Sequence, residues 1–289
     1  MTAPSAPAGA ASAAPAAPPP PAKKSPPRPR RRLPGGDALL GTGGVLAFLL
    51  IWEIVPRTPL VSADYLPPAS EVLATLAERT ATAKFWTAVG DTLAAWGLGL
   101  AIAVGAAVLL GFAIGTVPVL RAYTASTVEF LRPIPSVALI PLAILIYGTD
   151  IASTLMLVIY AAFWQVYVQV LYGVADIDPV ADQTARAYGL GRWARIRHLI
   201  WPTALPYLIT GVRLGAAVAL ILTITAQLTI GSPGLGQEIA VAQSSGAPDV
   251  VYALIVATGI LGVAVNTGVR ALERRVLRWH PSVRGEAAV

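Results

Sequence analysis

The sequence predicts an all-α polytopic membrane protein of about six transmembrane helices. Of its 289 residues, 55% are hydrophobic and 12% are charged, and the mean hydropathy is +0.66. The apolar residues gather in long runs, and glycine and alanine recur at intervals of four within two of them, a spacing that lets helices in lipid pack closely. A soluble domain of this length carries about twice this charged fraction, so lipid is the expected solvent for most of the chain.

Composition also excludes several kinds of site. The chain has no cysteine, which removes disulfides, thiolate metal sites and cysteine nucleophiles. Its two histidines, His198 and His280, are far apart and outside any carboxylate cluster, so we predict no metal site and no catalytic residues. No GxxxxGK[ST] phosphate loop is present, so we expect no ATPase site and no cofactor in this chain. The net charge of +6 comes from residues flanking apolar runs, which favours a membrane over a nucleic acid as partner.

Three regions follow from the composition. Residues 1–36 are Ala/Pro-rich and basic, and are predicted to be a disordered tail. Residues 37–279 form the predicted membrane domain, and residues 280–289 a short C-terminal tail. The first apolar run has no small-residue cleavage pattern before Pro56, so it is predicted to be an uncleaved span.

The predicted spans differ in their packing signals. An amphipathic helix beginning near Pro68 is expected between the first two spans, with Val72, Leu73 and Leu76 on its apolar face. Arg121 is expected in a short turn before the third span. The expected small-residue contacts are Gly97, Ala101, Gly105, Gly111 and Gly115 in the second span, and Gly211, Gly215 and Ala219 in the fifth. Five of the six spans are predicted at about residues 38–55, 93–117, 151–172, 205–230 and 250–269, and the third follows Arg121 and runs to about Tyr147.

The distribution of basic residues predicts the orientation. Fifteen of the 21 Lys and Arg residues fall in the N-terminal tail, the central loop 175–202 and the C-terminal segment, which lie on one side of a six-span layout. The positive-inside rule therefore predicts an inner-membrane protein with both termini and the central loop in the cytoplasm.

The central loop is polar between two apolar spans. Asp178 followed by Pro179 predicts a helix start, and Gly189 is placed to end that helix in a left-handed conformation. Trp193, Ile196 and Leu199 predict the apolar side of a second short helix, which Pro202 is expected to stop. Two short amphipathic helices joined by a glycine bend suit a groove on a soluble protein. The loop taken alone fits equally well an ordinary solvated connection between spans.

This loop resembles the cytoplasmic EAA loop of ABC importer permeases. The matching positions are Gln183, Thr184, Ala185, Gly189, Leu199, Trp201 and Pro202, of which Gln183, Thr184 and Trp201 depart from the family's pattern. The resemblance implies that the loop couples to an ATPase subunit. The coupling residues it implies, with the helix start, are Asp178, Gln183, Thr184, Ala185, Tyr188, Gly189, Leu199 and Pro202.

A wider resemblance covers about residues 46–279. The Trp52-Glu53 pair, residues 131–148, residues 210–214, Gly234-Leu-Gly and residues 273–279 look like permeases of the nitrate/taurine/aliphatic-sulfonate class of binding-protein-dependent ABC importers. It implies the type I importer permease fold with cytoplasmic coupling helices, a homodimer, a cytoplasmic ATPase subunit that holds ATP and Mg, and an extracytoplasmic substrate-binding protein. It also implies a cargo such as nitrate, a sulfonate or taurine, bicarbonate, or a vitamin precursor. Gln227 stands where the family usually has a glutamate.

Polar groups inside the spans are the candidates for a translocation path. Glu129 and Arg132 are predicted to pair with each other, Arg213 to snorkel, and Glu53 to be a helix-packing residue. The segment Gly234, Leu235 and Gly236 is either a plain turn or, by the resemblance, an outer gate loop. The path candidates are Glu129, Arg132, Pro133, Pro135, Gln165, Gln169, Thr223 and Gln227, although each uncharged one is more often a contact between helices.

The alternative function is a secondary transporter driven by an ion gradient. It would need a buried carboxylate near mid-membrane, for which Glu53 and Glu129 are the weak candidates. A membrane enzyme would need a convergent nucleophile, base or metal set, and the sequence offers none.

Overall fold

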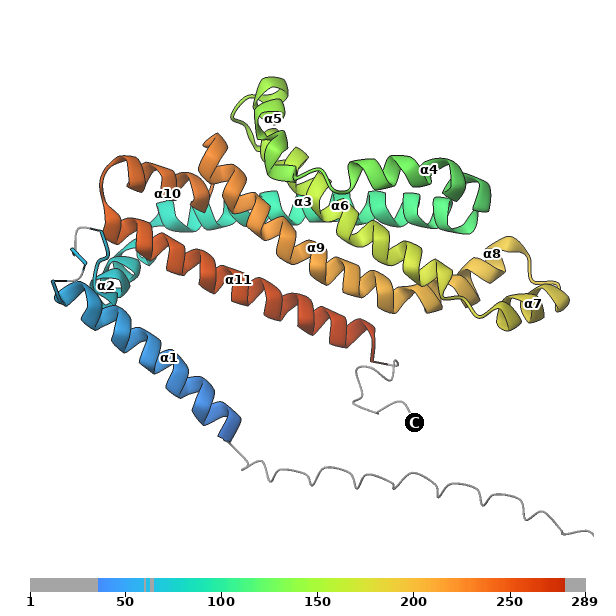
Figure 1. Cartoon of the computed structure of the whole chain (residues 1–289), viewed down its shortest axis with the longest axis horizontal. Helices are drawn as coiled ribbons and strands as arrows, with labels where there is room; N and C mark the ends of the chain where they lie inside the picture. Colours follow the sequence, from blue (N-terminus) through green and yellow to red (C-terminus); the bar gives the residue numbers. More distant parts are fainter. Residues whose placement is uncertain (1–35, 60, 63–64, 279–289) are drawn as a thin grey trace, which may run out of the picture. The chain divides into compact units, whose positions relative to one another are not determined.

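The computed structural model describes residues 36–59, 61–62 and 65–278, and these residues are almost entirely helical (Figure 1). They fall into two compact units that divide after Ala47, and the packing described below lies within the second unit, from Phe48 onward. The predicted tails, residues 1–35 and 280–289, lie outside the described residues. The elements are α1 Gly36–Ile54, η1 Val55–Arg57, α2 Ala69–Thr80, α3 Ala83–Thr116, α4 Pro118–Leu131, η2 Ser136–Leu139, α5 Ile140–Tyr147, α6 Ile151–Ala175, α7 Pro179–Ala187, α8 Arg192–Arg195, η3 Ile196–Ile200, α9 Trp201–Ile230, α10 Leu235–Ser244 and α11 Pro248–Val276.

The membrane-spanning elements agree with the predicted number. Within the described residues, five helical runs are long and apolar enough to cross a membrane, and a bent pair makes a sixth if it counts as one span. That pair is α4 with the segment from Ser136 to Tyr147, bent by 81°. The all-α fold with about six spans is confirmed.

The predicted third span is a bent pair of helical segments and not one straight helix. Arg121 lies inside α4 and not in a turn, and the chain breaks between Leu131 and Ser136. Pro133 and Pro135 explain the break, because each lacks an N–H and disfavours helix at the residue before it.

The α3 helix packs against α6 along a stripe of small residues. Gly99, Ala103, Ala107 and Gly111 are buried at four-residue intervals, and a Cβ at Gly111 would lie 2.7 Å from Val170 Cγ1. The predicted stripe is confirmed at Gly111 and at Gly115, where a Cβ would lie 3.1 Å from Val174 Cγ1. Its first part is wrong, because a Cβ at Gly97 or Gly105 would meet nothing within 4 Å and Ala101 is exposed. The helix also begins earlier than predicted, at Ala83.

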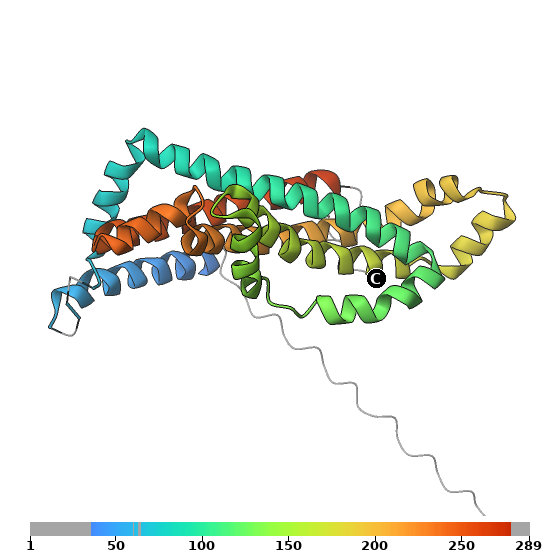
Figure 2. The same cartoon turned by 90° about the horizontal axis from the view of Figure 1, so that it is seen from above.

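The α9 helix packs on α6 through the predicted glycines. A Cβ at Gly211 would lie 3.0 Å from Val166 Cα, and one at Gly215 would lie 3.2 Å from Val166 Cγ2. Ala219 is fully buried in the same cluster. Helix α6 therefore packs against both α3 and α9 (Figures 1 and 2). The Trp96 Nε1–H of α3 also donates to Ala216 O of α9 at 2.9 Å.

One end of the second unit is closed by α2, α10 and the first turns of α3 and α11. Helix α2 begins at Ala69 as predicted and buries Val72 completely, although Leu73 is half-exposed. Glu53 accepts from the Ser70 N–H at 2.9 Å and from its hydroxyl at 3.0 Å, so it is a helix-packing residue as predicted. Helix α10 was not predicted, and its Glu238 pairs with Lys84 of α3 at 2.8 Å.

Candidate functional site

The polar loop, residues 175–202, lies at the end of the second unit opposite α2 and α10 (Figure 1). Its first helix, α7, begins as predicted: an Asp178 carboxylate oxygen accepts from the Val180 N–H at 2.8 Å, and Pro179 occupies the first turn. It also ends as predicted, because Gly189 has a φ of +73°. The Gly189 N–H donates to Arg186 O and the Leu190 N–H to Ala185 O, which is the Schellman arrangement that fixes where the chain leaves the helix.

The second helix of the polar loop does not stop at Pro202. Helix α8 runs through the π-helical turn η3 directly into α9, and Pro202 lies in the first turn of α9. The Trp201 N–H donates to Ile196 O, five residues back, which is the wider spacing of a π-turn. A proline ring normally crowds the preceding turn, and the widened turn lets the helix continue past it.

Asp182 ties the two helices of the polar loop together. It pairs with Arg186 one turn later on α7, at 2.7 Å, and with Arg195 on α8. Partial burial alone would raise the pKa of the Asp182 carboxyl, but hydrogen bonds from Arg195 and Arg186 and the charges of both lower that pKa below its usual value. The sequence reading missed this pairing, although an acid four residues before an arginine is a recognisable helix signal.

The side chains that the polar loop presents outward are large. Tyr188 is 82% exposed and Trp193 is 74% exposed, so Trp193 does not lie on the packed side that its spacing predicted. Gln183 and Thr184 are exposed too, whereas Ala185, Leu199 and Pro202 are half-buried. Exposed aromatic residues on a charged loop whose helices are tied together are typical of a surface that docks a protein partner.

The glycine-rich segment after α9 is held by Gln227, which is fully buried. Gln227 Oε1 lies 3.0 Å from the Thr92 hydroxyl and accepts from the Gly236 N–H at 3.3 Å, while Nε2 donates to Pro233 O at 3.0 Å. The Thr92 hydroxyl in turn accepts from the Leu235 N–H at 2.9 Å. Gly234 has a φ of +144°, and a Cβ there would overlap the Gln227 amide. The predicted gate segment is therefore clamped against α9 and α3 in this conformation.

The eight path candidates do not converge. Thr223 and Gln227 are fully buried in α9, and the Thr223 hydroxyl donates to Ala219 O in its own helix. Gln165 and Gln169 lie half-buried on α6, while Glu129, Arg132, Pro133 and Pro135 are exposed on α4 and the break after it. The predicted Glu129 to Arg132 ion pair is wrong, since no ion pair joins them in the described part of the chain. Arg213 contacts Glu273 of α11 at 3.6 Å.

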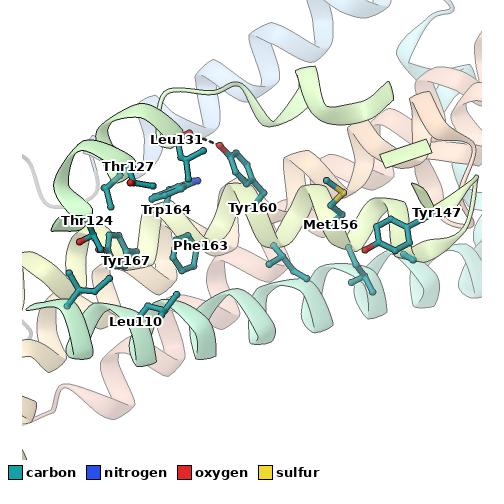
Figure 3. A pocket seen from close by; sticks show the side chains of 15 residues that line it. Leu110, Thr124, Thr127, Leu131, Tyr147, Met156, Tyr160, Phe163, Trp164 and Tyr167 are labelled. Atoms are coloured by element: carbon teal, nitrogen blue, oxygen red, sulfur yellow. Dashed lines mark hydrogen bonds between the residues drawn. The ribbon is translucent and has the colours of Figure 1, made fainter. Parts of the chain in front are cut away.

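A groove of about 760 Å³ opens between α3, α4, α5 and α6 (Figure 3). Its wall on α6 is aromatic, and we call it the aromatic groove. Tyr160 donates to Leu131 O at 2.5 Å, but Trp164 Nε1 and the Tyr167 hydroxyl are buried and have no hydrogen-bond partner among the described residues. The lining residues are Leu110, Ile114, Thr124, Thr127, Val128, Leu131, Tyr147, Ala152, Leu155, Met156, Ile159, Tyr160, Phe163, Trp164 and Tyr167.

Sequence reasoning missed this groove, although its signal is visible in the sequence. Tyr160, Phe163, Trp164 and Tyr167 follow the i, i+3, i+4, i+7 spacing that places side chains on one helix face. In the described residues, no three His, Asp or Glu side chains gather closely enough to hold a metal ion.

Comparison with known proteins places this architecture in a family. Residues 99–278 match the family model described as "Binding-protein-dependent transport system inner membrane component". The taurine transport system permease protein TauC of Escherichia coli (strain K12) is 31% identical over 84% of this chain and 90% of its own length. A putative aliphatic sulfonates transport permease protein, SsuC of Bacillus subtilis (strain 168), is 28% identical over 88% of this chain and 94% of its own length. The bicarbonate transport system permease protein CmpB of Synechococcus elongatus is 26% identical over 86% of this chain and 92% of its own length.

Solved structures show the same fold. The inward-facing MetNI methionine ABC transporter gives a TM-score of 0.55 at 20% identity, covering 65% of this chain and 94% of that one. A bacterial ABC transporter involved in the import of the acidic polysaccharide alginate gives a TM-score of 0.58 at 15% identity, and the match covers 83% of this chain and 96% of that one. The family match over residues 99–278 and the 31% identity to TauC show that the chain belongs to the binding-protein-dependent transport system inner membrane components, the permease subunits of ABC importers.

Proposed function

We propose that two copies of this chain form the translocation path of an ATP-driven importer for a small anion, and that the polar loop of each copy docks on a separate cytoplasmic ATPase subunit. The observation that carries the proposal is the build of the polar loop. Its two helices are fixed by the Gly189 turn and the Asp182 ion pairs, and they present Tyr188 and Trp193 to a partner. A rigid surface of this kind can transmit a movement, whereas a flexible connection would absorb it.

The orientation in this proposal follows from charge. The positive-inside rule places the basic tail, the polar loop and the C-terminal segment on the cytoplasmic side of the inner membrane. In this orientation the polar loop faces ATP, and α2 and α10 face the binding protein. ATP binding would draw two ATPase subunits together, and the polar loops would carry that movement into α6 and α9. The ATP and Mg would sit on the partner subunit and not on this chain.

The cargo class is proposed from the relatives. Their names report taurine, aliphatic sulfonates and bicarbonate, all of which carry an anionic oxygen group. Nitrate and a vitamin precursor remain within the class that the sequence resembles. The coupling role of Asp178, Gln183, Thr184, Ala185, Tyr188, Gly189, Leu199 and Pro202, and the path and gate roles assigned from the sequence, are part of this proposal.

Co-purification tests the coupling. The tagged chain is purified from its native membrane in mild detergent as wild type, Gly189→Val and Gly189→Asn. A β-branched residue strains the left-handed conformation at φ +73°, while asparagine tolerates it, so Asn is the matched control. We expect an ATPase subunit and ATP hydrolysis with wild type and Gly189→Asn, and loss of both with Gly189→Val although it still inserts.

Two outcomes would contradict the proposal. If Gly189→Val keeps its ATPase subunit and full uptake, the polar loop is not the coupling element. If the wild-type chain purifies well folded and alone, and uptake follows an ion gradient without ATP, it works as a secondary transporter.

A further inference from the structure

We propose that the exposed face at the C-terminal end of α11 binds an anionic phospholipid, whose phosphate contacts Arg274 and Arg275 while one acyl chain lies along Gly268 and Leu272. This site is separate from the coupling and cargo roles proposed above. It requires only that the chain spans a membrane.

The position of these arginines along α11 is the first step of the argument. Residues 250–269 carry no charged side chain, and at 1.5 Å per residue they span about 30 Å, the thickness of the hydrocarbon core of a bilayer. Arg270 comes directly after this run, and α11 continues to Val276. The arginines at the end of the helix therefore lie at the level of the lipid headgroups.

The helix face that they share is the second step. Gly268, Ala271, Leu272 and Arg275 follow the i, i+3, i+4, i+7 spacing of one helix face, and Arg274 lies at its edge. All five residues are exposed, and all five line one surface pocket. A Cβ at Gly268 would meet nothing within 4 Å, so an acyl chain has room beside the helix. Along this face, apolar residues in the membrane give way to arginines at its surface.

The charges of Arg274 and Arg275 are the third step. Glu273 is the one acidic residue between positions 250 and 278, and it contacts Arg213 of α9 at 3.6 Å. Neither Arg274 nor Arg275 forms an ion pair or a side-chain hydrogen bond with another described residue. Both guanidinium groups can therefore bind the oxygens of a phosphate, for which their planar donors are well suited.

Charge and position favour a lipid over a protein as the occupant. A second copy of the chain that met this face with its own would set arginine against arginine, which is unfavourable. The polar loop, on which we propose that the ATPase docks, projects farther: Figure 1 shows that α11 ends well short of α7 and α8 along the horizontal axis of the view. An anionic phospholipid supplies a phosphate at the level of the arginines and an acyl chain for the apolar residues next to them.

Native mass spectrometry can test the site, because it resolves each lipid bound to the intact permease and its co-purified subunits. The complex is titrated with dioleoyl phosphatidylglycerol and with dioleoyl phosphatidylcholine, which have the same acyl chains and differ in headgroup charge. Arg274→Gln/Arg275→Gln removes two charges, and Arg274→Lys/Arg275→Lys keeps them. Arg192→Gln/Arg197→Gln is the matched control, because it removes two exposed arginines from the polar loop.

We expect the wild-type complex to bind its first phosphatidylglycerol about thirtyfold more tightly than phosphatidylcholine, since each arginine near a membrane surface contributes about fivefold. The glutamine pair should lose this preference, whereas the lysine pair and the control should keep most of it. Added salt should weaken the preference, because it screens exposed charges. Glycerol phosphate, which has the phosphate but no acyl chain, should not displace the lipid.

Four results would overturn the inference. Equal affinities of the wild-type complex for the two lipids would remove the role of charge. An unchanged preference in the glutamine pair, or an equal loss in the control, would mean that the lipid does not bind at this face. Displacement by glycerol phosphate would make the face a site for a soluble anion. Separation of the permease copies in the glutamine pair would make it a contact between subunits. None of these measurements uses ATP hydrolysis or uptake, so a failure here is distinguishable from a failure of the proposed function.

Discussion

Gln227 illustrates at the residue scale how a polar group inside a span can hold the fold together. Its amide bonds Thr92 of α3, Pro233 and Gly236, and so fastens three segments at one point. The sequence could indicate that Gln227 is unusual, but not what it contacts, because Thr92 is 135 positions away. Whether it also contributes to a path stays a prediction.

Replacing Gln227 with leucine should lower stability more than the same change at an exposed site. Gln227→Leu leaves Thr92, the Gly236 N–H and the Pro233 carbonyl without their buried partner, at a cost of about 1–3 kcal/mol for each group that stays unpaired. Thermal unfolding in detergent measures the effect. Gln243→Leu on α10 is the control, because Gln243 is exposed. Equal unfolding temperatures for the two variants would contradict the clamp.

Asp182→Asn should uncouple ATP hydrolysis from transport without unfolding the chain. The change removes the charge that joins Arg186 on α7 to Arg195 on α8, so the two helices can move separately. The measurement is uptake per ATP hydrolysed, and we expect a several-fold decrease. Asp178→Asn is the comparison, since asparagine still caps a helix; a decrease as large there would mean that any loss of charge from the loop suffices.

The ion pairs of Asp182 depend on pH in a direction that its pKa shift defines. The pKa of Asp182 is lowered in the folded chain, so its ion pairs add stability above the ordinary aspartate pKa of about 3.9, and this stability is lost as the pH falls through the folded pKa. Coupling in wild type should therefore be insensitive to Asp182 titration between about pH 6 and 8, a range above both values.

At the scale of elements, the small-residue stripe of α3 shows why a pattern fixes a helix better than its packing face. The helix has glycine or alanine at four-residue intervals on two faces, one through Gly97 and Gly105 and one through Gly99 and Gly111. Only the second meets α6. The sequence predicted the helix and its close packing correctly, but it could not choose between the faces, because the choice depends on where Val158 and Val170 of α6 lie.

Matched alanine substitutions should separate these two faces. Gly111→Ala places a Cβ 2.7 Å from Val170 Cγ1 and should destabilise the folded chain by about 1–3 kcal/mol, the usual cost of overpacking. Gly105→Ala meets nothing within 4 Å and should be neutral or slightly stabilising, because alanine favours helix over glycine. The unfolding midpoints of the two variants measure which face of α3 is packed. A larger loss for Gly105→Ala would mean that the exposed face packs on another chain.

Other elements were beyond what local patterns specify. The helix α10 follows a cluster of glycine and proline that reads as a turn, and its position depends on Phe85, Leu254 and other distant residues. The proline-containing third span reads as one apolar run, yet its prolines divide it into α4 and α5. The helix starts at Asp178 and Ala69 and the end at Gly189 were predicted well, because caps depend on neighbouring residues alone.

At the scale of the whole molecule, the absence of cysteine makes the orientation directly measurable. A single Ala187→Cys in the polar loop should react with a membrane-impermeant maleimide only when the cytoplasmic face is open. A single Ser245→Cys, which follows α10, should react from the outside of intact cells once the outer membrane is permeable. Both positions are exposed. The reverse pattern of labelling would invert the topology.

The continuity of α8, η3 and α9 has a mechanical consequence. Helical structure runs without a gap from Arg192 to Ile230, a rod of about 58 Å at 1.5 Å per residue. Helix α9 packs on α6 along this length, through Gly211 and Gly215 near its middle and through Ala226 and Ile230 beside Leu157 at its far end. We therefore expect a push on the polar loop to reach the Gln227 end as a movement of α6 and α9 together, with no relay of loops between them.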